Sequence, residues 1–416
     1  MKVIVAHPGK QHSLQSALAF QEHNSLSAYI TSVYSKKNSM LNYLKFFISK
    51  KQRLKANSRK NQDLPDNKVV QFCELSSLIL LLVSKFHVNR IITDYLNQSI
   101  QKRFAKKVAK YVIANNIDVI IMYDTTVYTA FDLIHKFSPN TLCILDTTIA
   151  SRAFIRDTYE YDLRLFPNSG LKKEQSFLWR NKSCLEKYNR EFQIADYYLV
   201  GSDFVKSTII RFVKNEKKII KIPYGVNLEQ FKNTERDFLT GPLHLLFVGG
   251  IIRRKGVHHL LKVISQYSSK DIILHLAGAY NPKDTLYQEY KNSDNIIFEG
   301  FVTRDVINKI YKRCHIFILP SLAEGMAMVG LEALASGLPV ICSENTGLDD
   351  VIIEGKNGFK IPVSNEISLK EKIDFCLNNR DILHNMSEIA AKSVNNYSWE
   401  EYRKRLYNSI LQLKNS

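Results

Sequence analysis

Short runs of β-branched and other apolar residues recur along the chain, separated by longer stretches with helical periodicity. Continuous apolar runs of this kind are typical of strands that are buried on both faces of a sheet. Because strand and helix patterns alternate in both halves, the sequence predicts two parallel, doubly wound α/β sheets. The predicted strands cover residues 3–5, 119–121, 142–145 and 197–200, and then 245–248, 272–276, 296–298, 316–319 and 339–341.

Proline and glycine follow a strand end near the middle of the chain, in Ile222-Pro223-Tyr224-Gly225-Val226. This combination is how a chain changes direction between compact units, so we expect domains at residues 1–222 and 223–398. The last segment begins with a capping-box pattern, because Ser398 is followed three residues later by Glu401. We expect a helix over residues 399–416 that packs back on the first domain.

The most informative stretch follows the run at 316–319 and is predicted to be a strand, a tight loop, a helix and another strand. Gly325 lets the backbone approach a ligand, and the amides of Met326 and Ala327 would point outward from the start of a helix, where anions and hydroxyls are favoured. Glu324 in the loop and Glu332 two turns along the helix would both face the crevice and could hold two polyols. A loop charge and a solvent-facing helix residue would give the same spacing.

A run of three cations, Arg253-Arg254-Lys255, stands beside a glycine loop after an apolar strand. Breaking a sugar–phosphate bond releases a diphosphate, so a catalyst must stabilise the negative charge that develops on the leaving oxygen. Fixed cations and helix N-termini can do this without a metal ion. The chain has no Asp-x-Asp triplet that would chelate a metal beside a diphosphate, so we expect a metal-independent mechanism and no cofactor. The alternative for the three cations is a solvated turn.

These motifs resemble the donor-binding signature of the retaining GT-B glycosyltransferases of family 4, in which two glutamates are separated by seven residues. The likeness is strong from about Ile222 to Trp399 and weak before that, and it includes the segments at 247–257 and 345–359. It implies a GT-B fold of two facing Rossmann-like domains with a crevice between them. It also implies transfer of a hexose, with retention of configuration, from a UDP- or GDP-sugar to a hydroxyl of a glycan or lipid-linked glycan.

The resemblance assigns roles to several of these residues. Glu332 would bond the ribose hydroxyls, Glu324 would hold the hydroxyls of the transferred sugar, and Lys255 would neutralise the diphosphate. The family often has an arginine where Gly250 stands, so that role passes to Arg253 or Arg254. Glu324, Lys255 and Arg254 are the expected catalytic residues. The expected donor contacts are Gly249, Gly250, Arg253, Arg254, Lys255, Gly278, Phe301, Val302, Glu324, Gly325, Met326, Ala327, Val329 and Glu332.

Polar residues also follow the strands of the first half, at the mouth of the predicted crevice. Many relatives carry a donor-contacting histidine after a middle strand of this domain, but neither 123–126 nor 146–152 contains one. The acid/base group is therefore unassigned. Isolated loop histidines are more often structural, and the aspartates could be helix N-caps. The candidates for acceptor or crevice contacts are His7, Gly9, Lys10, Gln11, His12, Asp124, Asp146 and Arg152.

The net charge of +18 over 416 residues indicates an anionic partner. Residues 23–62 contain no acidic residue, and apolar Phe46, Phe47 and Ile48 stand among their cations. We expect an amphipathic segment on an anionic membrane surface, with a solvated basic loop as the alternative. The basic residues of this stretch are Lys45, Lys50, Lys51, Arg53, Lys55, Arg59 and Lys60, and a second basic cluster comprises Lys102, Arg103, Lys106, Lys107 and Lys110.

The six cysteines form no Cys-x-x-Cys pair, and the longest apolar run, residues 78–83, is too short to span a bilayer. We therefore expect a cytoplasmic protein at the cytoplasmic face of the inner membrane, acting in surface-polysaccharide assembly. No recognition-helix, zinc or aromatic-platform pattern favours a nucleic-acid partner. A GT-B epimerase or phosphorylase, or a basic binding protein without catalysis, stays open as an alternative function.

Overall fold

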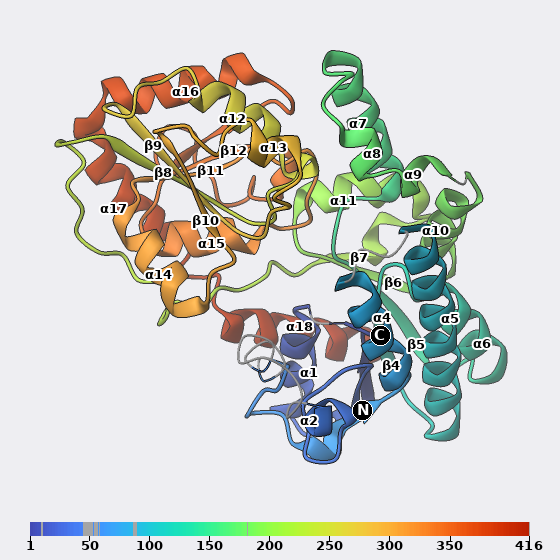
Figure 1. The fold of residues 1–416 in the computed structure, drawn as a ribbon. Coiled ribbons are helices and arrows are strands. Elements are labelled where there is room, and N and C mark those ends of the chain that lie inside the picture. The colour runs from blue at the N-terminus through green and yellow to red at the C-terminus, as the bar shows by residue number, and fades with distance from the viewer. Residues whose placement is uncertain are drawn as a thin grey trace.

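The computed structural model describes residues 1–9, 11–44, 53, 57, 59–85, 90–180 and 182–415. These residues fold into two α/β domains (Figure 1). Each domain is a parallel sheet with helices packed around it, as the alternation of strand and helix patterns predicts.

Within the described residues, seven strands form the first sheet in the order β3-β2-β1-β4-β5-β6-β7. The strands are β1 (Val3–Ala6), β2 (Leu26–Thr31), β3 (Val69–Gln71), β4 (Val119–Tyr123), β5 (Leu142–Thr147), β6 (Tyr197–Val200) and β7 (Ile219–Lys221). The helices of this part of the chain are α1 (Ser13–Gln21), α2 (Met40–Leu44), α4 (Glu74–Lys85), α5 (Arg90–Ala114), α6 (Tyr128–Phe137), α7 (Arg152–Leu165), α8 (Leu171–Glu174), α9 (Phe177–Arg180), α10 (Lys182–Ile194) and α11 (Asp203–Ile209).

The second sheet has six described strands in the order β10-β9-β8-β11-β12-β13. They are β8 (Leu243–Val248), β9 (Ile272–Ala277), β10 (Ile296–Gly300), β11 (Ile316–Leu319), β12 (Val340–Ser343) and β13 (Gly358–Ile361). The helices are α12 (Val257–Ile264), α13 (Thr285–Gln288), α14 (Arg304–Arg313), α15 (Met328–Ala335), α16 (Glu366–Asn378), α17 (Leu383–Ser393) and α18 (Trp399–Asn415). In both sheets the strand order reverses beside the first strand, at the switch point where doubly wound folds bind ligands.

The chain passes twice between the domains, and the two passages lie side by side. The Val226 N–H donates to the Tyr397 carbonyl at 2.7 Å. A Cβ at Gly225 would lie 2.5 Å from the Trp399 nitrogen, so only glycine fits at this crossing. The Ser398 hydroxyl accepts from the Glu401 N–H at 3.1 Å, as the capping pattern predicts. Helix α18 then lies along α1 (Figure 1), where the Tyr402 and Ser16 hydroxyls are 2.8 Å apart.

The carboxyl ends of the two sheets meet at the domain boundary. After β11, the Glu324 carbonyl accepts from the Ala150 N–H, which follows β5, at 3.0 Å. The next carbonyl, of Gly325, accepts from the Ser202 hydroxyl, which follows β6, also at 3.0 Å. The loop that carries the most informative motif therefore lies between the domains.

The basic part of the predicted membrane segment, residues 45–60, mostly lies outside the described residues, including Lys45, Phe46, Phe47, Ile48, Lys50, Lys51 and Lys55. Of its described cations, Lys60 pairs with Asp66 at 3.4 Å. The second basic cluster is on the exposed face of α5. Among the helices that the structure describes, none is both long and apolar enough to cross a membrane.

Candidate functional site

Two cations and a carboxylate form the centre of the site. Arg254 and Lys255 belong to a short 3₁₀ turn, η5 (Arg253–Lys255), which ends at Gly256 with φ of 67°. A Cβ on Gly256 would lie 1.8 Å from the Pro320 carbonyl oxygen, so glycine allows the turn to pack against the end of β11. The Lys255 ammonium contacts Glu324 Oε1, and Arg254 Nη1 lies 3.6 Å from the same oxygen.

The charges of this cluster support one another in a largely dry environment. Glu324 is only 8% exposed. Burial by itself would raise the pKa of Glu324, but Lys255 and Arg254 outweigh it and hold that pKa below its usual value. Burial lowers the pKa of Lys255, and the negative charge of Glu324 opposes this effect. The arrangement is a fixed pair of cations at the switch point of the second sheet, where an anionic leaving group could be stabilised.

Arg253 does not belong to this cluster, although it is the neighbour of Arg254 in the sequence. Its guanidinium bonds both oxygens of Asp284, at 2.7 and 3.0 Å. It also bonds the Ser169 carbonyl and lies 3.6 Å from Glu174 Oε2. These acceptors occupy the Arg253 guanidinium, and Arg254 is the arginine that lies beside Lys255 and Glu324, so donor binding by Arg253 stays a prediction.

Glycines bring the strand ends together beside η5. A Cβ at Gly278 would lie 1.6 Å from the Gly249 carbonyl oxygen, so the loops after β8 and β9 touch through their backbones. The Gly278 N–H donates to the Gly300 carbonyl at 2.9 Å, which adds the end of β10. Of the expected donor contacts here, Gly250 and Val302 are partly exposed and Phe301 is 47% exposed. The backbone thus forms a shallow glycine-rich edge next to the cations.

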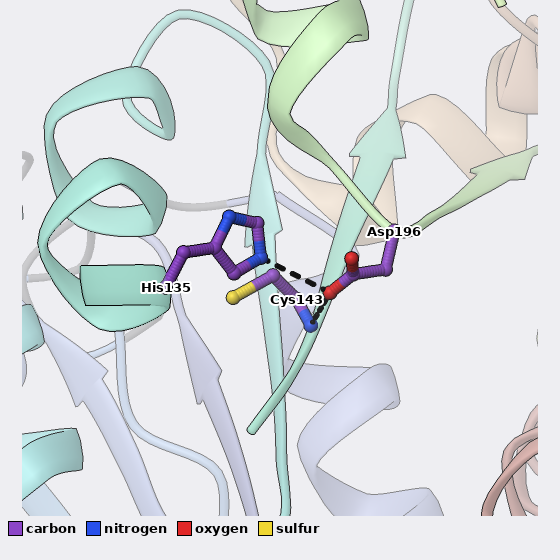
Figure 2. A group of neighbouring side chains, drawn as sticks. All are labelled: His135, Cys143 and Asp196. Carbon is purple, nitrogen blue, oxygen red and sulfur yellow. Dashed lines mark hydrogen bonds and ion pairs between the residues drawn. The ribbon is translucent and has the colours of Figure 1, made fainter. Parts of the chain in front are cut away.

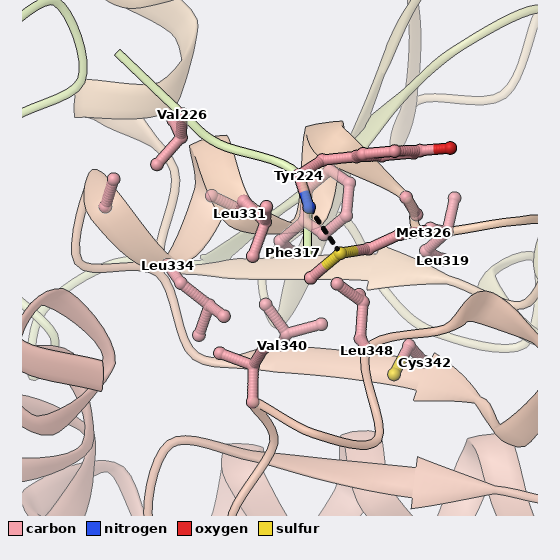
Figure 3. Packing of buried hydrophobic residues seen from close by; sticks show 14 of the residues in the cluster. Tyr224, Val226, Phe317, Leu319, Met326, Leu331, Leu334, Val340, Cys342 and Leu348 are labelled. Atoms are coloured by element: carbon pink, nitrogen blue, oxygen red, sulfur yellow. Dashed lines mark hydrogen bonds between the residues drawn. The ribbon is translucent and has the colours of Figure 1, made fainter. Parts of the chain in front are cut away.

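The start of α15 differs in part from the expectation that its backbone amides face a ligand. The Ala327 N–H donates to the Thr346 carbonyl at 3.0 Å, so this amide is not available to a ligand as predicted. Gly325 does allow a close approach, but its neighbour is the protein's own backbone: a Cβ at this position would lie 1.9 Å from the Thr148 carbonyl oxygen, which excludes any side chain. The Met326 sulfur accepts from the Tyr224 N–H at 3.2 Å and packs among buried apolar residues (Figure 3).

Glu332 lies further along α15 and is held by a buried tyrosine. The Tyr311 hydroxyl donates to Glu332 Oε2 and also lies close to the Val329 carbonyl, with both distances 3.2 Å. Burial and the nearby Glu332 charge raise the pKa of Tyr311 well above its usual value, so the hydroxyl stays protonated. Of the two glutamates of the motif, Glu324 thus faces the cations Lys255 and Arg254, and Glu332 accepts from the Tyr311 hydroxyl.

In the first domain, two aspartates form separate pairs: Asp146 in a buried one and Asp124 in a partly buried one. His12 Nε2 lies 2.9 Å from Asp146 Oδ2, with both side chains about 3% exposed. Asp124 Oδ1 accepts from the Thr148 hydroxyl at 2.6 Å, and Arg152 lies 3.7 Å from its other oxygen. Thr148 thus connects Asp124 to the backbone beside Gly325. The aspartates are not the N-caps of the helices that follow them, since Val127 is at the N-cap of α6 and Ser151 caps α7.

The remaining candidates follow β1. His7 Nδ1 accepts from the Gly9 N–H at 3.0 Å, and burial lowers the pKa of His7 to about 4, so the ring is neutral. Gln11 is exposed, and Lys10 lies outside the described residues. His7 and Gly9 line a cavity of about 240 Å³.

Sequence reasoning missed three residues around the site. Tyr159 of α7 is buried near the charges of Arg254 and Glu324, and burial raises its pKa. Glu174 accepts the backbone N–H groups of Arg253 and Arg254, at 2.7 and 3.1 Å, and so fixes η5 from the first domain. Glu191 accepts from the Thr125 N–H at 2.8 Å, and burial raises its pKa to about 8. No local motif marks such contacts, because they join distant segments.

Two groups of described side chains could in principle hold a metal ion, and both lie outside this cluster. Figure 2 shows the first, in which Asp196 accepts from the Cys143 N–H at 2.8 Å and faces His135 at 3.2 Å. Burial raises the pKa of the Cys143 thiol, which disfavours the thiolate that a metal would need. The second group, Asp162 with His258 and His259, joins the two domains.

Comparison with known proteins agrees with this geometry. The two-domain arrangement is the GT-B fold, as predicted: Anabaena Alr3699/HepE, solved in complex with UDP-glucose, superposes with a TM-score of 0.63 over 99% of this chain and 100% of that chain, at 12% identity. Residues 229–393, which contain Lys255, Glu324 and Glu332, match the family Glycosyl transferases group 1.

Two curated relatives match at the level of sequence. The uncharacterised glycosyltransferase MJ1178 of Methanocaldococcus jannaschii is 28% identical over 50% of this chain and 57% of its own length. The capsular polysaccharide biosynthesis glycosyltransferase CapM of Staphylococcus aureus is 23% identical over 60% of this chain and 71% of its own length. The match to MJ1178 therefore spans little more than half of that protein.

Proposed function

We propose that this protein is a glycosyltransferase that moves a hexose from a nucleoside-diphosphate sugar to a hydroxyl of a glycan or lipid-linked glycan. The observation that carries the proposal is the cluster of Arg254, Lys255 and Glu324 at the switch point of the second sheet. It lies inside the segment that matches Glycosyl transferases group 1. The UDP-glucose complex of the similar fold supports a nucleotide-sugar donor.

In this proposal the chain's own groups carry out the donor half of the reaction. Arg254 and Lys255 stabilise the charge that develops on the diphosphate, without a metal ion. Glu324 accepts hydrogen bonds from the hexose hydroxyls, and Glu332 accepts them from the ribose. Transfer retains the anomeric configuration. The CapM match supports a role in surface-polysaccharide assembly, on a cytoplasmic membrane face that the basic side of α5 contacts.

Thermal-shift measurements with UDP-, GDP-, ADP- and dTDP-sugars test the donor assignment, because a ligand that binds only the folded state raises its stability. We expect one nucleotide class to raise the melting temperature of the wild-type protein and to have a smaller effect on Glu332→Ala. A melting temperature that none of the nucleotide sugars changes would contradict the proposal.

A further inference from the structure

Among the described residues, one cation without a carboxylate partner lines the cavity next to His7. It has a volume of about 240 Å³, and it lies between the loop after β1, the turn after β4 and helices α4 and α5. Arg59 lines it and is partly buried. Within the described part of the chain, Arg59 has no carboxylate partner and no acidic residue lines this cavity. An uncompensated, partly desolvated guanidinium favours an anion such as phosphate.

Hydroxyls, amides and leucines are among the other lining groups. Thr125, Thr126 and Asn97 offer polar contacts, while Leu80 and Leu81 provide an apolar wall. Drug-sized ligands usually need roughly 300–1,000 Å³, so the cavity fits one small headgroup and no complete nucleotide sugar. A ligand larger than such a headgroup must extend beyond the cavity.

Helix α4 provides an apolar surface outside the cavity. Apart from its end residues Glu74 and Lys85 and three serines, its sequence consists of leucine, isoleucine and valine. A helix that is apolar on all sides is normally buried. Here Leu78 packs inward against Val33 and Leu41, but Leu75, Ile79 and Leu82 are 53%, 48% and 51% exposed. Helix α5, with its exposed cations, lies beside α4 (Figure 1).

The cavity is also close to the candidate site. Thr125 and Thr126 line it, and the preceding residue, Asp124, binds the Thr148 hydroxyl at 2.6 Å. The Thr148 carbonyl in turn lies against Gly325, next to Glu324. Asp124, which precedes the lining residue Thr125, is thus two contacts away from the loop proposed to hold the transferred sugar.

We propose that this cavity binds the phosphate-bearing headgroup of an amphiphilic acceptor, with Arg59 on the phosphate and Leu81 and the exposed face of α4 on its hydrocarbon chain. The proposal rests on the glycosyltransferase function stated above and names its acceptor class: a hydroxyl carried on a phosphorylated hydrocarbon chain. Charge complementarity argues for this occupant, since the same face combines an unpaired guanidinium, the cations of α5 and an apolar helix.

Calorimetric titration with farnesyl phosphate, farnesol and inorganic phosphate measures the contributions of the phosphate headgroup and of the hydrocarbon chain to binding. We expect farnesyl phosphate to bind the wild-type protein at least tenfold more tightly than either fragment. Arg59→Gln should weaken its binding roughly tenfold or more, because a charge-assisted contact is lost. In Leu81→Ser, farnesyl phosphate should bind little more tightly than inorganic phosphate. UDP binding, measured in parallel, should be unchanged in both variants.

Two matched variants control for general effects. Lys60→Gln removes the neighbouring cation, which pairs with Asp66, and Leu239→Ser removes a 68% exposed leucine of the second domain. Both should bind farnesyl phosphate like the wild type. Equal binding by wild type, Arg59→Gln and Leu81→Ser, or no binding by the wild type, would overturn the acceptor site. Failure of the donor assignment would instead appear as loss of wild-type nucleotide binding, with the farnesyl phosphate results unaffected.

Discussion

His259 Nε2 lies 2.7 Å from Asp162 Oδ1, and the two residues belong to different domains. The other ring nitrogen of His259 faces Glu366 at 3.1 Å. Because both nitrogens face carboxylate oxygens, the ring is an imidazolium that donates in both directions. Burial by itself lowers the pKa of His259, but its hydrogen bonds to Asp162 and Glu366 outweigh burial and raise it. The domains are thus joined by a buried ionic bridge.

This bridge predicts a pH-dependent stability. A raised histidine pKa gives stability that is complete below about pH 6.5 and is lost as the pH rises through the raised value. The pKa of Asp162 is lowered: burial opposes this, but the nearby His258 and the hydrogen-bonded His259 prevail, so its contribution is complete above about pH 4. His259→Gln should therefore destabilise the protein most between these limits, by roughly 3–5 kcal/mol at pH 6.

Urea unfolding of wild type and His259→Gln at pH 6 and pH 9 measures this effect. The difference between the two proteins should be smaller at pH 9. His384→Gln is a matched control, because His384 is 67% exposed beside Glu388 and should change stability little at either pH. An equal loss at both pH values would show that the ionic bridge is not responsible.

Substitution of the two glutamates of the motif should affect different steps. Glu332→Ala should weaken nucleoside diphosphate binding by roughly 1.5–3 kcal/mol, because a charge-assisted contact to the ribose is lost. Glu324→Ala should lower turnover more than nucleotide affinity. Titration calorimetry and initial rates distinguish these outcomes, with the exposed Glu354→Ala as a control. If both variants bind the nucleotide like the parent, the assignment of the two roles is wrong.

Lys255 should be essential through its charge. Lys255→Ala should slow turnover by roughly 10²–10³-fold, the scale that is typical of removing one preorganised donor from a developing anion. It also leaves buried Glu324 with only Arg254 as a nearby cation, at 3.6 Å. Lys255→Arg should recover part of the rate. Comparing the stability of Lys255→Ala with that of Lys255→Ala/Glu324→Gln measures how much the unpaired carboxylate destabilises the protein. Unchanged turnover in Lys255→Ala would contradict the role.

Activity should survive chelation. Fixed cations stand at the proposed diphosphate site, and the sequence has no Asp-x-Asp triplet beside it. We expect equal initial rates with and without EDTA. Loss of activity with EDTA, restored by Mg²⁺ or Mn²⁺, would overturn the metal-independent mechanism.

Membrane binding should depend on the basic face of α5. Each cation near an anionic leaflet contributes about 1 kcal/mol. Replacing Lys102, Lys106 and Lys110 by Gln should reduce sedimentation with anionic liposomes, whereas the same change at Lys309 and Lys312 of α14 should not. Equal recovery on anionic and neutral liposomes would contradict an electrostatic attachment.

Apolar periodicity was sufficient to predict most of the fold. All nine apolar runs coincide with strands, because central strands of a parallel sheet are buried on both faces. The strands β3 and β7 have three residues each, and β13 begins with Gly358, so their patterns are too short or too mixed to recognise. Strand β2 was missed because Ser27 and Thr31 interrupt its apolar pattern.

The site was predictable only where chemistry is local in sequence. The spacing of Glu324 and Glu332 and the position of Lys255 are visible in the chain. That Asp284 and Glu174 would occupy Arg253, or that Thr346 would occupy the Ala327 amide, depends on segments 19 or more residues away. Such pairings arise from tertiary packing, which periodicity and motif spacing do not specify.

The central claim is that Glu324 and Lys255 act on a nucleotide sugar. Its most direct test is release of nucleoside diphosphate from a panel of UDP-, GDP-, ADP- and dTDP-sugars, compared between wild type, Glu324→Ala and Lys255→Ala. We expect release from at least one donor by the wild type and a loss of roughly 10²-fold or more in both variants. No release from any donor by a folded wild-type protein, or equal release by all three proteins, would contradict it.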